Sequence, residues 1–427
     1  MMNQEQIKQR SRRGRRRRGR GGRHGGPPGA GGGQPWQAGP PRGDDVPFGP
    51  QQRIRVTGVL ELTPDGQGWL RSIATSYVPE DTDPYLPVSL TRAANLRPGS
   101  EVDGWAERLR GRLTVVDVQA VDGLTPDKAA VLPLFKQLTS VDPTERFVLE
   151  GGEAVEGDNG ATHNMRVLDL ITPVGMGQRG LITASPRSGK TILLQQIANR
   201  ISLAYPDVHL IVLLVDERPE EATHFRRSVK GEVIASTNDE PADRHTRVTE
   251  LTIERAKRLV EAGKDVVIVM DSLTRLGRAY NVTIRNSGRT LSGGVDSRTL
   301  EKPKAFFGAA RKVEGGGSLT ILATALIETG SRMDEVIFEE FKGTGNMELV
   351  LSRELAERRI YPAIDINKSG TRKEELLLPA DVYRKVVLLR RVLSQMHPVE
   401  AMQLLLAKVK ETKTNEQFLA SFDVRSY

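Results

Sequence analysis

The segment Ala184-Ser-Pro-Arg-Ser-Gly-Lys-Thr191 decides the fold, because it joins an apolar run to an amphipathic stretch. Residues 180–183 (GLIT) are typical of a buried strand, and residues 192–201 (ILLQQIANRI) are typical of a helix. A Gly-Lys-Thr step between a strand and a helix is the context of a phosphate-binding P-loop. Ala184 occupies the position of the pattern's first glycine, so a plain turn remains the alternative.

The residues on either side predict an α/β core. Four further apolar runs are separated by amphipathic stretches, at 208–215 (VHLIVLLV), 231–237 (GEVIAST), 265–270 (DVVIVM) and 318–326 (SLTILATAL). Continuous apolar strands that alternate with helices indicate a parallel sheet buried on both faces. We therefore expect one ATPase-type domain over residues 151–427, with a helical part in the last 50 residues.

The first third of the chain has a different pattern. Residues 51–122 contain short alternating apolar runs between turn signals, which predicts five strands in a small β-barrel. Residues 123–150 hold three prolines and are expected to be a linker. Residues 1–50 are rich in arginine and glycine, and we expect a disordered arm there because few apolar side chains could offset the ordering entropy.

The charge of the chain is concentrated in that arm. The whole chain carries a formal charge of +8, whereas residues 1–42 hold eleven basic side chains and one acid, which leaves −2 for the rest. A uniformly basic nucleic-acid binder is therefore excluded. The arm is either a phosphate-binding segment for RNA or DNA, or a solubilising tail.

Composition also limits the class of protein. The chain has no cysteine, which excludes disulfides, cysteine-based zinc sites and thiol nucleophiles. No apolar run reaches the roughly 18–20 residues of a spanning helix, and no apolar segment follows the basic N-terminus. We expect a soluble, cytoplasmic protein without a membrane partner.

The order of charged residues on successive strands predicts nucleotide chemistry. In a P-loop, Lys190 reaches the β- and γ-phosphate oxygens and Thr191 ligates Mg²⁺. Asp271 ends the strand 265–270 and is the candidate second Mg²⁺ ligand, while Glu217 ends the strand that begins at residue 208 and is the candidate general base. The alternative for each acid is a simple strand end at the surface.

A catalytic glutamate placed before the Asp271 strand resembles the RecA-like and rotary ATP-synthase group. That resemblance implies a ring in which an arginine of the next subunit completes each site, with Arg372 and Arg359 as candidates and Tyr361 as a platform for adenine. The expected ATP-binding residues are Gly175, Met176, Gly177, Gln178, Arg179, Gly180, Arg187, Ser188, Gly189, Lys190, Thr191, Ile192, Arg218 and Tyr361.

Longer blocks are more specific than the P-loop. Segments 216–245 (DERPEEATHFRRSVKGEVIASTNDEPADRH), 304–331 (KAFFGAARKVEGGGSLTILATALIETGS) and 362–377 (PAIDINKSGTRKEELL) closely resemble the Rho family of bacterial transcription termination factors. The resemblance implies a homohexameric, ATP-driven 5′–3′ RNA translocase and helicase that releases nascent RNA from RNA polymerase. It also implies a RecA-like core, an OB or cold-shock-type barrel and two RNA sites.

The primary RNA site is expected on the barrel, where residues 58–71 (GVLELTPDGQGWLR) match the family's pattern. An exposed aromatic beside arginine is a stacking platform for unpaired bases, although Trp69 and Tyr85 fit a barrel core equally well. The candidates are Gly66, Gln67, Gly68, Trp69, Leu70, Arg71, Asp83, Pro84, Tyr85, Arg110, Gly111 and Arg112. Gln67 replaces a usual aromatic and the loop 108–112 is changed, so we expect weaker pyrimidine preference and stronger dependence on salt.

The secondary site is expected in two loops that line the centre of the ring, around residues 281–297 and 328–332. The candidate contacts are Arg289, Thr290, Ser292 and Arg332; ordinary surface loops are the alternative. Two other functions remain open at this point. One is a RecA-like DNA motor, and the other is an RNA-binding ring that senses ATP without robust turnover.

Overall fold

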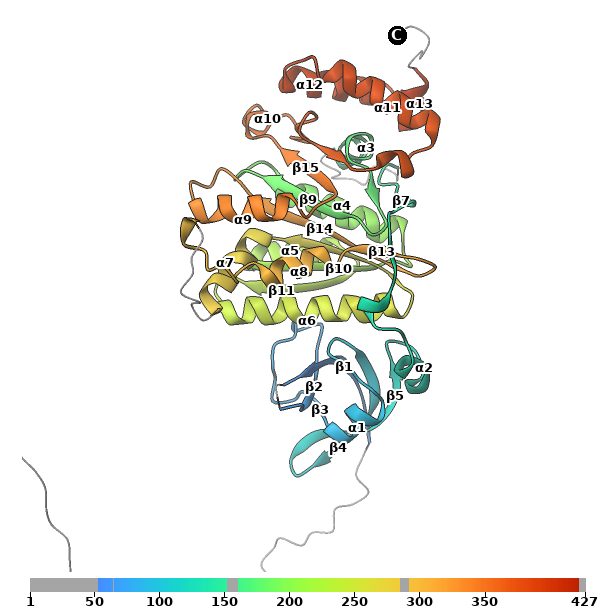
Figure 1. Ribbon diagram of the computed structural model, residues 1–427, viewed down its shortest axis with the longest axis vertical. Coiled ribbons are helices and arrows are strands. Elements are labelled where there is room, and N and C mark those ends of the chain that lie inside the picture. Colours follow the sequence, from blue (N-terminus) through green and yellow to red (C-terminus); the bar gives the residue numbers. More distant parts are fainter. Residues whose placement is uncertain (1–52, 64, 152–159, 285–291, 422–427) are drawn as a thin grey trace, which may run out of the picture. The chain divides into compact units, whose positions relative to one another are not determined.

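The computed structural model describes residues 53–63, 65–151, 160–284 and 292–421, which belong to one compact unit that begins at residue 51. The described residues form a β-barrel and an α/β sheet covered by helices (Figure 1). The predicted arm lies outside them and stays a prediction. Within the described ranges, no helix is both long and apolar enough to cross a membrane.

The N-terminal barrel has the predicted strands. It closes in the order β1-β2-β3-β5-β4. Its core contains small and branched side chains such as Val56, Leu60, Leu70 and Val102. The barrel elements are β1 (Ile54–Leu62), β2 (Gly68–Arg71), β3 (Tyr85–Leu86), α1 (Val88–Ala93), β4 (Glu101–Leu109) and β5 (Arg112–Val121).

The expected linker is partly structured. Its strand β6 joins the central sheet through β13, and β7 pairs with β8. A stretch that contains prolines can therefore still form short strands at the edge of a sheet, paired with segments far along the chain. The elements between barrel and core are α2 (Pro126–Ala130), η1 (Phe135–Gln137), β6 (Ser140–Val141) and β7 (Arg146–Phe147), whereas β8 (Val174–Gly175) belongs to the core.

The central sheet has the order β11-β10-β12-β14-β9-β15-β16, and the five strands that the sequence predicted are all parallel. Parallel strands need crossover helices, which cover both faces and explain the continuous apolar runs. The strands are β9 (Arg179–Ala184), β10 (His209–Glu217), β11 (Glu232–Thr237), β12 (Asp265–Asp271), β13 (Arg311–Val313), β14 (Ser318–Leu326), β15 (Met347–Leu351) and β16 (Gly370–Thr371).

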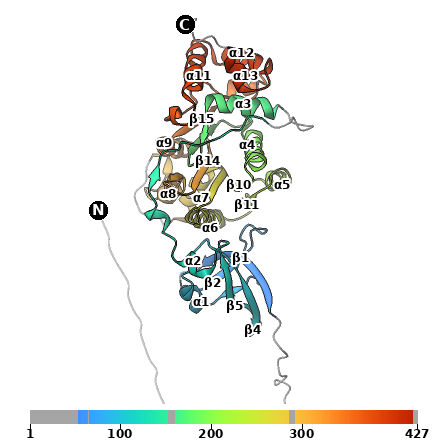
Figure 2. The ribbon, with the colours of Figure 1, turned by 90° about the vertical axis from the view of Figure 1, so that its right-hand side faces the viewer.

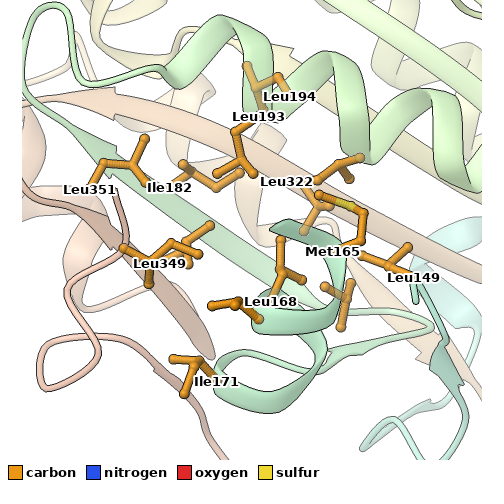
Figure 3. Packing of buried hydrophobic residues seen from close by; sticks show 14 of the residues in the cluster. Leu149, Met165, Leu168, Ile171, Ile182, Leu193, Leu194, Leu322, Leu349 and Leu351 are labelled. Atoms are coloured by element: carbon orange, nitrogen blue, oxygen red, sulfur yellow. The ribbon is translucent and has the colours of Figure 1, made fainter. Parts of the chain in front are cut away.

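Two hydrophobic clusters hold the helices on the sheet. One contains Leu193 and Leu194 of α4 packed with Ile182, Leu322 and the α3 residues drawn in Figure 3. The other covers the opposite face beneath α6. The helical elements are α3 (Ala161–Ile171), α4 (Lys190–Ala204), α5 (Pro219–Ser228), α6 (Ala242–Glu261), α7 (Leu273–Thr283), η2 (Ser292–Gly294), α8 (Glu301–Gly308), α9 (Arg332–Lys342), α10 (Arg353–Glu357) and η3 (Glu374–Leu376).

The predicted helical end of the chain comprises α11 (Ala380–Leu393), α12 (Pro398–Lys410) and α13 (Asn415–Ala420), which pack near α3 (Figure 2). Arg166 of α3 is 2% exposed and donates hydrogen bonds to the carbonyl oxygens of Val409, at 2.6 Å, and Thr412, at 2.5 Å. Val409 lies in the last turn of α12 and Thr412 lies just beyond its end, where the regular pattern of helical hydrogen bonds stops. A buried arginine therefore fixes the C-terminal helices to the core.

Candidate functional site

The P-loop joins β9 to α4 at the carboxyl edge of the sheet. Arg187 has a φ of 68° and Gly189 a φ of 88°, so the chain turns through two left-handed residues before α4 begins at Lys190. Ala184 is the fully buried last residue of β9 and has no such conformation. Glycine is therefore not required there, which explains the departure from the usual pattern.

The loop offers hydrogen-bond donors that nothing else uses. The hydroxyl groups of Ser185 and Ser188 are buried, and neither has a partner within the described ranges. The first N–H groups of α4 also lack partners inside the helix and carry partial positive charge. Such a loop suits the oxygens of a phosphate chain.

A lysine and two carboxylates meet beside the loop. Nζ of Lys190 is 2.5 Å from Oδ1 of Asp271 and 3.4 Å from Oε1 of Glu217. The carboxylates are almost fully buried. They come from adjacent strands, because Leu214 of β10 pairs with Asp271 of β12. The structure therefore brings together the three charged residues that the sequence pattern selected.

Glu217 reaches this cluster through an irregularity in β10. Leu214 belongs to the cluster that contains α4, and Val215 belongs to the cluster on the opposite face. Strict alternation would place Glu217 on the side of Val215, away from Lys190. The register with β11 shifts between Val215 and Glu217, where Asp216 has a φ of 56°. This bulge turns Glu217 toward the P-loop.

The surroundings shift the pKa values of both groups. Burial, followed by the charge of Asp271, raises the pKa of Glu217 to about 7, against the opposing effect of Lys190 and Arg275. Burial lowers the pKa of Lys190, but the charges of Asp271 and Glu217 outweigh it, and the net shift is upward. A carboxyl group with a pKa near neutrality is suited to accept a proton from water.

The cluster also contains three residues that were not predicted from the sequence: Arg275, Thr324 and Glu221. Nε of Arg275 lies 3.3 Å from Oε1 of Glu217, and the hydroxyl group of Thr324 donates to Asp271 at 2.7 Å. The hydroxyl group of Thr191 donates to Glu221 at 3.1 Å. Thr324 lies on β14 beside β12, and Glu221 lies in the first turn of α5, so strand order and helix position could have indicated both.

The donor set fits a divalent cation. Carboxylate oxygens of Glu217, Glu221 and Asp271 lie within 4.8 Å of one another. Oδ2 of Asp271 is buried and has no hydrogen-bond partner among the residues that the structure describes. Oxygen ligands with an unused carboxylate oxygen suit Mg²⁺, which prefers a few carboxylates together with phosphate oxygens. Of the predicted ligands, Asp271 belongs to this cluster and Thr191 adjoins it through its hydrogen bond to Glu221.

An apolar pocket of about 290 Å³ adjoins the P-loop. Tyr361, which is 41% exposed, and Ile192, which is 57% exposed, line it together with Ser188 and Gly189. An added Cβ on Gly189 would lie 3.1 Å from the Tyr361 ring. An exposed aromatic ring beside a phosphate loop is suitably placed to stack on a nucleotide base.

The other expected ATP residues lie near the loop or far from it. Arg187 and Arg359 line a neighbouring pocket, and Arg218 is exposed at the start of α5. Residues 175–180 lie at the amino end of β9, where Gly177 N–H donates to Thr320. Because the P-loop is at the opposite end of β9, residues 175–180 are remote from the phosphate site of their own chain.

Arg372 also lies at this opposite edge. It follows β16, and its backbone N–H donates to the carbonyl oxygen of Asn346 at 2.8 Å. It is close enough to Arg179 for its charge to lower the pKa of that residue, after the larger effects of burial and of the charge of Arg311. Arg372 can therefore reach a bound nucleotide only if that nucleotide belongs to another subunit.

The barrel presents an aromatic platform outside its core. The rings of Trp69 and Tyr85 are 5.5 Å apart and edge-on, and neither belongs to the barrel's hydrophobic cluster. The guanidinium group of Arg112 lies 5.1 Å from each ring centroid. No acidic side chain pairs with Arg112 in the described part of the chain. Half-exposed rings with an unpaired cation resemble single-stranded nucleic-acid sites.

Two of the expected RNA contacts, Arg71 and Asp83, have partners within the chain, and their contact with RNA stays a prediction. Arg71 and Asp83 are 7% and 5% exposed and form an ion pair of 2.5 Å, and Arg71 also pairs with Glu61 at 2.7 Å. Leu70 is buried in the barrel core. The charge of Arg71 is therefore already neutralised, whereas that of Arg112 is not.

The remaining barrel candidates surround the platform. Arg110 and Gly111, with φ of 51° and 80°, form the exposed two-residue turn between β4 and β5. Gln67 donates a hydrogen bond to Asp65 at 2.5 Å. Gly66, Gly68 and Pro84 belong to the same segments, since Gly68 pairs with Leu86 across β2 and β3.

The described parts of the two expected pore loops lie together at the carboxyl edge. An added Cβ on Gly293 would lie 2.8 Å from the carbonyl oxygen of Arg332, so η2 packs against the start of α9. Arg332 is exposed, and Ser292 begins η2. Arg289 and Thr290 lie outside the described residues, and their role stays a prediction.

Family models match both parts of the chain. Residues 164–371 match the nucleotide-binding domain of the ATP synthase alpha/beta family, and residues 56–127 match the RNA-binding domain of Rho termination factor. Among solved structures, an ATPase of a bacterial type III secretion system has a TM-score of 0.52 at 23% identity, over 60% of this chain and 82% of its own. An ATP synthase subunit from Nanoarcheaum equitans has a TM-score of 0.52 at 17% identity, over 60% and 63%. These likenesses show the ATPase fold.

Relatives match over nearly the whole described chain. Transcription termination factor Rho of Pseudomonas aeruginosa is 52% identical over 375 residues, which are 87% of this chain and 88% of the relative. Rho of Haemophilus influenzae is 55% identical over 366 residues, 84% and 86% of the two chains. The barrel, the P-loop core and these relatives together show that the chain belongs to the Rho family of transcription termination factors.

Proposed function

We propose that the protein is an RNA-dependent ATPase that terminates transcription, acting as a homohexameric 5′–3′ translocase and helicase on nascent RNA. The observation that carries the proposal is the meeting of Lys190, Glu217 and Asp271 beside a P-loop, in a chain that also has an aromatic platform on a Rho-type barrel. The ATPase core generates force, and the barrel binds unpaired bases.

The chemistry follows from the positions of the side chains. The P-loop and Lys190 hold the phosphates, and Thr191 and Asp271, with Glu221 nearby, would hold Mg²⁺, which screens the phosphate charge. Glu217 accepts a proton from a water molecule while the oxygen of that water attacks the γ-phosphorus. The bond to the β-phosphate oxygen then breaks, and ADP and phosphate leave. Arg275 holds Glu217 in place.

The position of Arg372 supports the proposed ring. It is remote from its own P-loop but lies on an edge of the sheet, where it can serve a neighbouring subunit. An arginine supplied in this way stabilises the charge that develops on the transferred phosphoryl group. Hydrolysis would then depend on assembly, and the loops at residues 292–294 and 327–332, on the same edge as Glu217 and Asp271, would move RNA through the centre. The RNA polymerase elongation complex is the proposed partner and the cytoplasm the proposed location.

The decisive test is the ATPase rate of the full chain with RNA and DNA homopolymers, each at two salt concentrations. We expect hydrolysis to require single-stranded RNA. Stimulation by DNA but not RNA would instead indicate a DNA motor, and binding of RNA without turnover would indicate an ATP-sensing ring. Release of a transcript from a stalled polymerase tests the termination step separately.

A further inference from the structure

The RNA platform rests on a buried ion pair. The guanidinium group of Arg71 lies 5.6 Å from the ring centroid of Trp69 and contacts both Asp83 and Glu61. Leu70 faces the barrel core, so Arg71 lies beside Trp69 on the outer face of β2 and supports the platform from there. A base that stacks on Trp69 therefore lies next to Arg71, whose charge is shared between the carboxylates of Asp83 and Glu61.

One of these carboxylates continues the contact into the ATPase core. Glu61 accepts hydrogen bonds from Nε and Nη2 of Arg247, on the first turns of α6. Burial raises the pKa of Glu61, but its hydrogen bonds to Arg247 and then Arg71 outweigh burial and lower the pKa overall. Glu61 thus joins the barrel and α6 through one shared charge. Figures 1 and 2 show α6 between β1 and the central sheet.

A second contact reaches the same end of α6. The turn that follows β2 carries Ser76, whose hydroxyl oxygen accepts a hydrogen bond from the N–H of Ala235 in β11 at 3.0 Å. The carbonyl oxygen of Ser76 accepts one from Arg244 at 3.4 Å. Ser76 and Tyr77 are 2% and 1% exposed. The strand that bears Trp69 is therefore fixed to the core close to the beginning of α6.

That end of α6 contacts the bulge that orients the catalytic glutamate. His245 bonds to the hydroxyl group of Ser236 at 2.7 Å, and its Nε2 lies 4.0 Å from Oδ1 of Asp216. Asp216 is the left-handed residue that turns Glu217 toward the P-loop. His245 and Arg247 are two residues apart on one helix, so movement of one displaces the other.

We propose that Arg247 is a positioning residue that couples the RNA platform to Glu217, through Glu61 on one side and the His245–Asp216 contact on the other. The proposal rests on the proposed function, because it needs an ATPase that RNA stimulates. Coupling of this kind arises when two sites bias one packed element, here the first turns of α6.

The test is Arg247→Gln in the full chain. Glu61 keeps Arg71 in this variant, so the barrel retains its buried partner. We expect the affinity for a short single-stranded RNA, the basal ATPase rate and the KM for ATP to be unchanged. The RNA-stimulated kcat should fall by about fivefold or more. Arg247→Lys, which keeps the charge, should restore part of the stimulation.

Arg97→Gln is the matched control. Arg97 also joins the barrel to α6, through a 2.6 Å ion pair with Glu261, but at the opposite end of that helix. Full stimulation in Arg97→Gln with loss in Arg247→Gln supports the coupling. Equal losses in both variants, or none in Arg247→Gln, overturn it, since the contact would then only dock the barrel. A wild-type chain that RNA fails to stimulate would refute the proposed function instead.

Discussion

Lys190 at the beginning of α4 and Asp271 at the end of β12 form an ion pair of 2.5 Å, in which the carboxylate is almost fully buried and the lysine side chain is 13% exposed. Two separate strands must therefore be correctly placed before the P-loop lysine has its partner. Glu217, at 3.4 Å from the same Nζ, depends on Lys190 as well. The phosphate-binding cation and both acids behave as one electrostatic unit, so a change in one alters the others.

Lys190→Ala should abolish hydrolysis and leave RNA binding intact. The variant loses the cation that faces the phosphates, and a loss of about a hundredfold or more in kcat is expected for such an electrostatic contact. ATPase rates at saturating RNA and RNA affinity by fluorescence anisotropy measure the two effects. Lys408→Ala, which changes an exposed lysine of α12, is the control. Equal weakening of RNA binding would mean that Lys190 is needed for folding rather than for phosphate binding.

Glu217→Gln should lose turnover but gain stability. The folded-state pKa of about 7 lies above the ordinary value of 4.5 for a glutamate. Below pH 4.5 the carboxyl group is protonated in both states and costs nothing. As pH rises from 4.5 to 7 the unfolded chain releases the proton that the folded chain still holds, so wild-type stability falls.

The stability gain of Glu217→Gln should therefore grow over this pH range and level off above pH 7. Thermal unfolding in metal-free buffer at several pH values measures it. Glu220→Gln, which changes an exposed acid in the first turn of α5, should show no such trend. A gain that is constant with pH would show that Glu217 is ionised normally in the fold.

Arg372→Ala should abolish hydrolysis at the ATP site of the neighbouring subunit and leave the P-loop site of its own subunit intact. ATP affinity of the isolated P-loop site should be unchanged, because Arg372 lies at the far end of β9. Mixing Arg372→Ala with Lys190→Ala subunits should restore part of the activity, since some interfaces then combine an intact P-loop with an intact arginine. Steady-state ATPase rates of the mixtures measure this. Mixtures as inactive as either variant would place Arg372 outside the catalytic unit.

The regular secondary structure of the barrel and of the central sheet was predicted well from the sequence. The barrel strands and the parallel strands were found because side-chain alternation and continuous apolar runs report directly on which faces are buried. Lys190, Glu217 and Asp271 were found because each occupies a strand or helix end next to the same sheet edge. These features depend on residues close together in the sequence, so one sequence is enough to predict them.

Contacts between distant segments were not predictable in the same way. Nothing in the local pattern shows that Asp216 forms a bulge, or that Arg71 forms ion pairs with Glu61 and Asp83. The linker was expected to be irregular, yet β6 completes a sheet edge with β13. Such outcomes depend on partners far along the chain, which neither periodicity nor motif spacing reports.

Arg112 should set how the primary site depends on salt and on base identity. Its guanidinium group lies 5.1 Å from both Trp69 and Tyr85 and has no acidic partner in the described ranges, so it can stack on a base and also attract phosphate. Arg112→Ala should weaken binding of short single-stranded RNA by about 1 kcal/mol. It should also reduce the slope of log affinity against log salt by about 0.7.

Arg112→Phe separates stacking from charge. It should restore much of the affinity at high salt and increase the preference among bases, because the ring stacks without the general attraction for phosphate. Arg110→Ala is the control, since Arg110 lies in the adjacent exposed turn but not over the rings. It should lower the salt slope without changing base preference. Fluorescence titrations of cytosine, uracil and adenine oligomers at two salt concentrations distinguish these results. Strict cytosine selectivity in the wild type would show that the cation does not control the site.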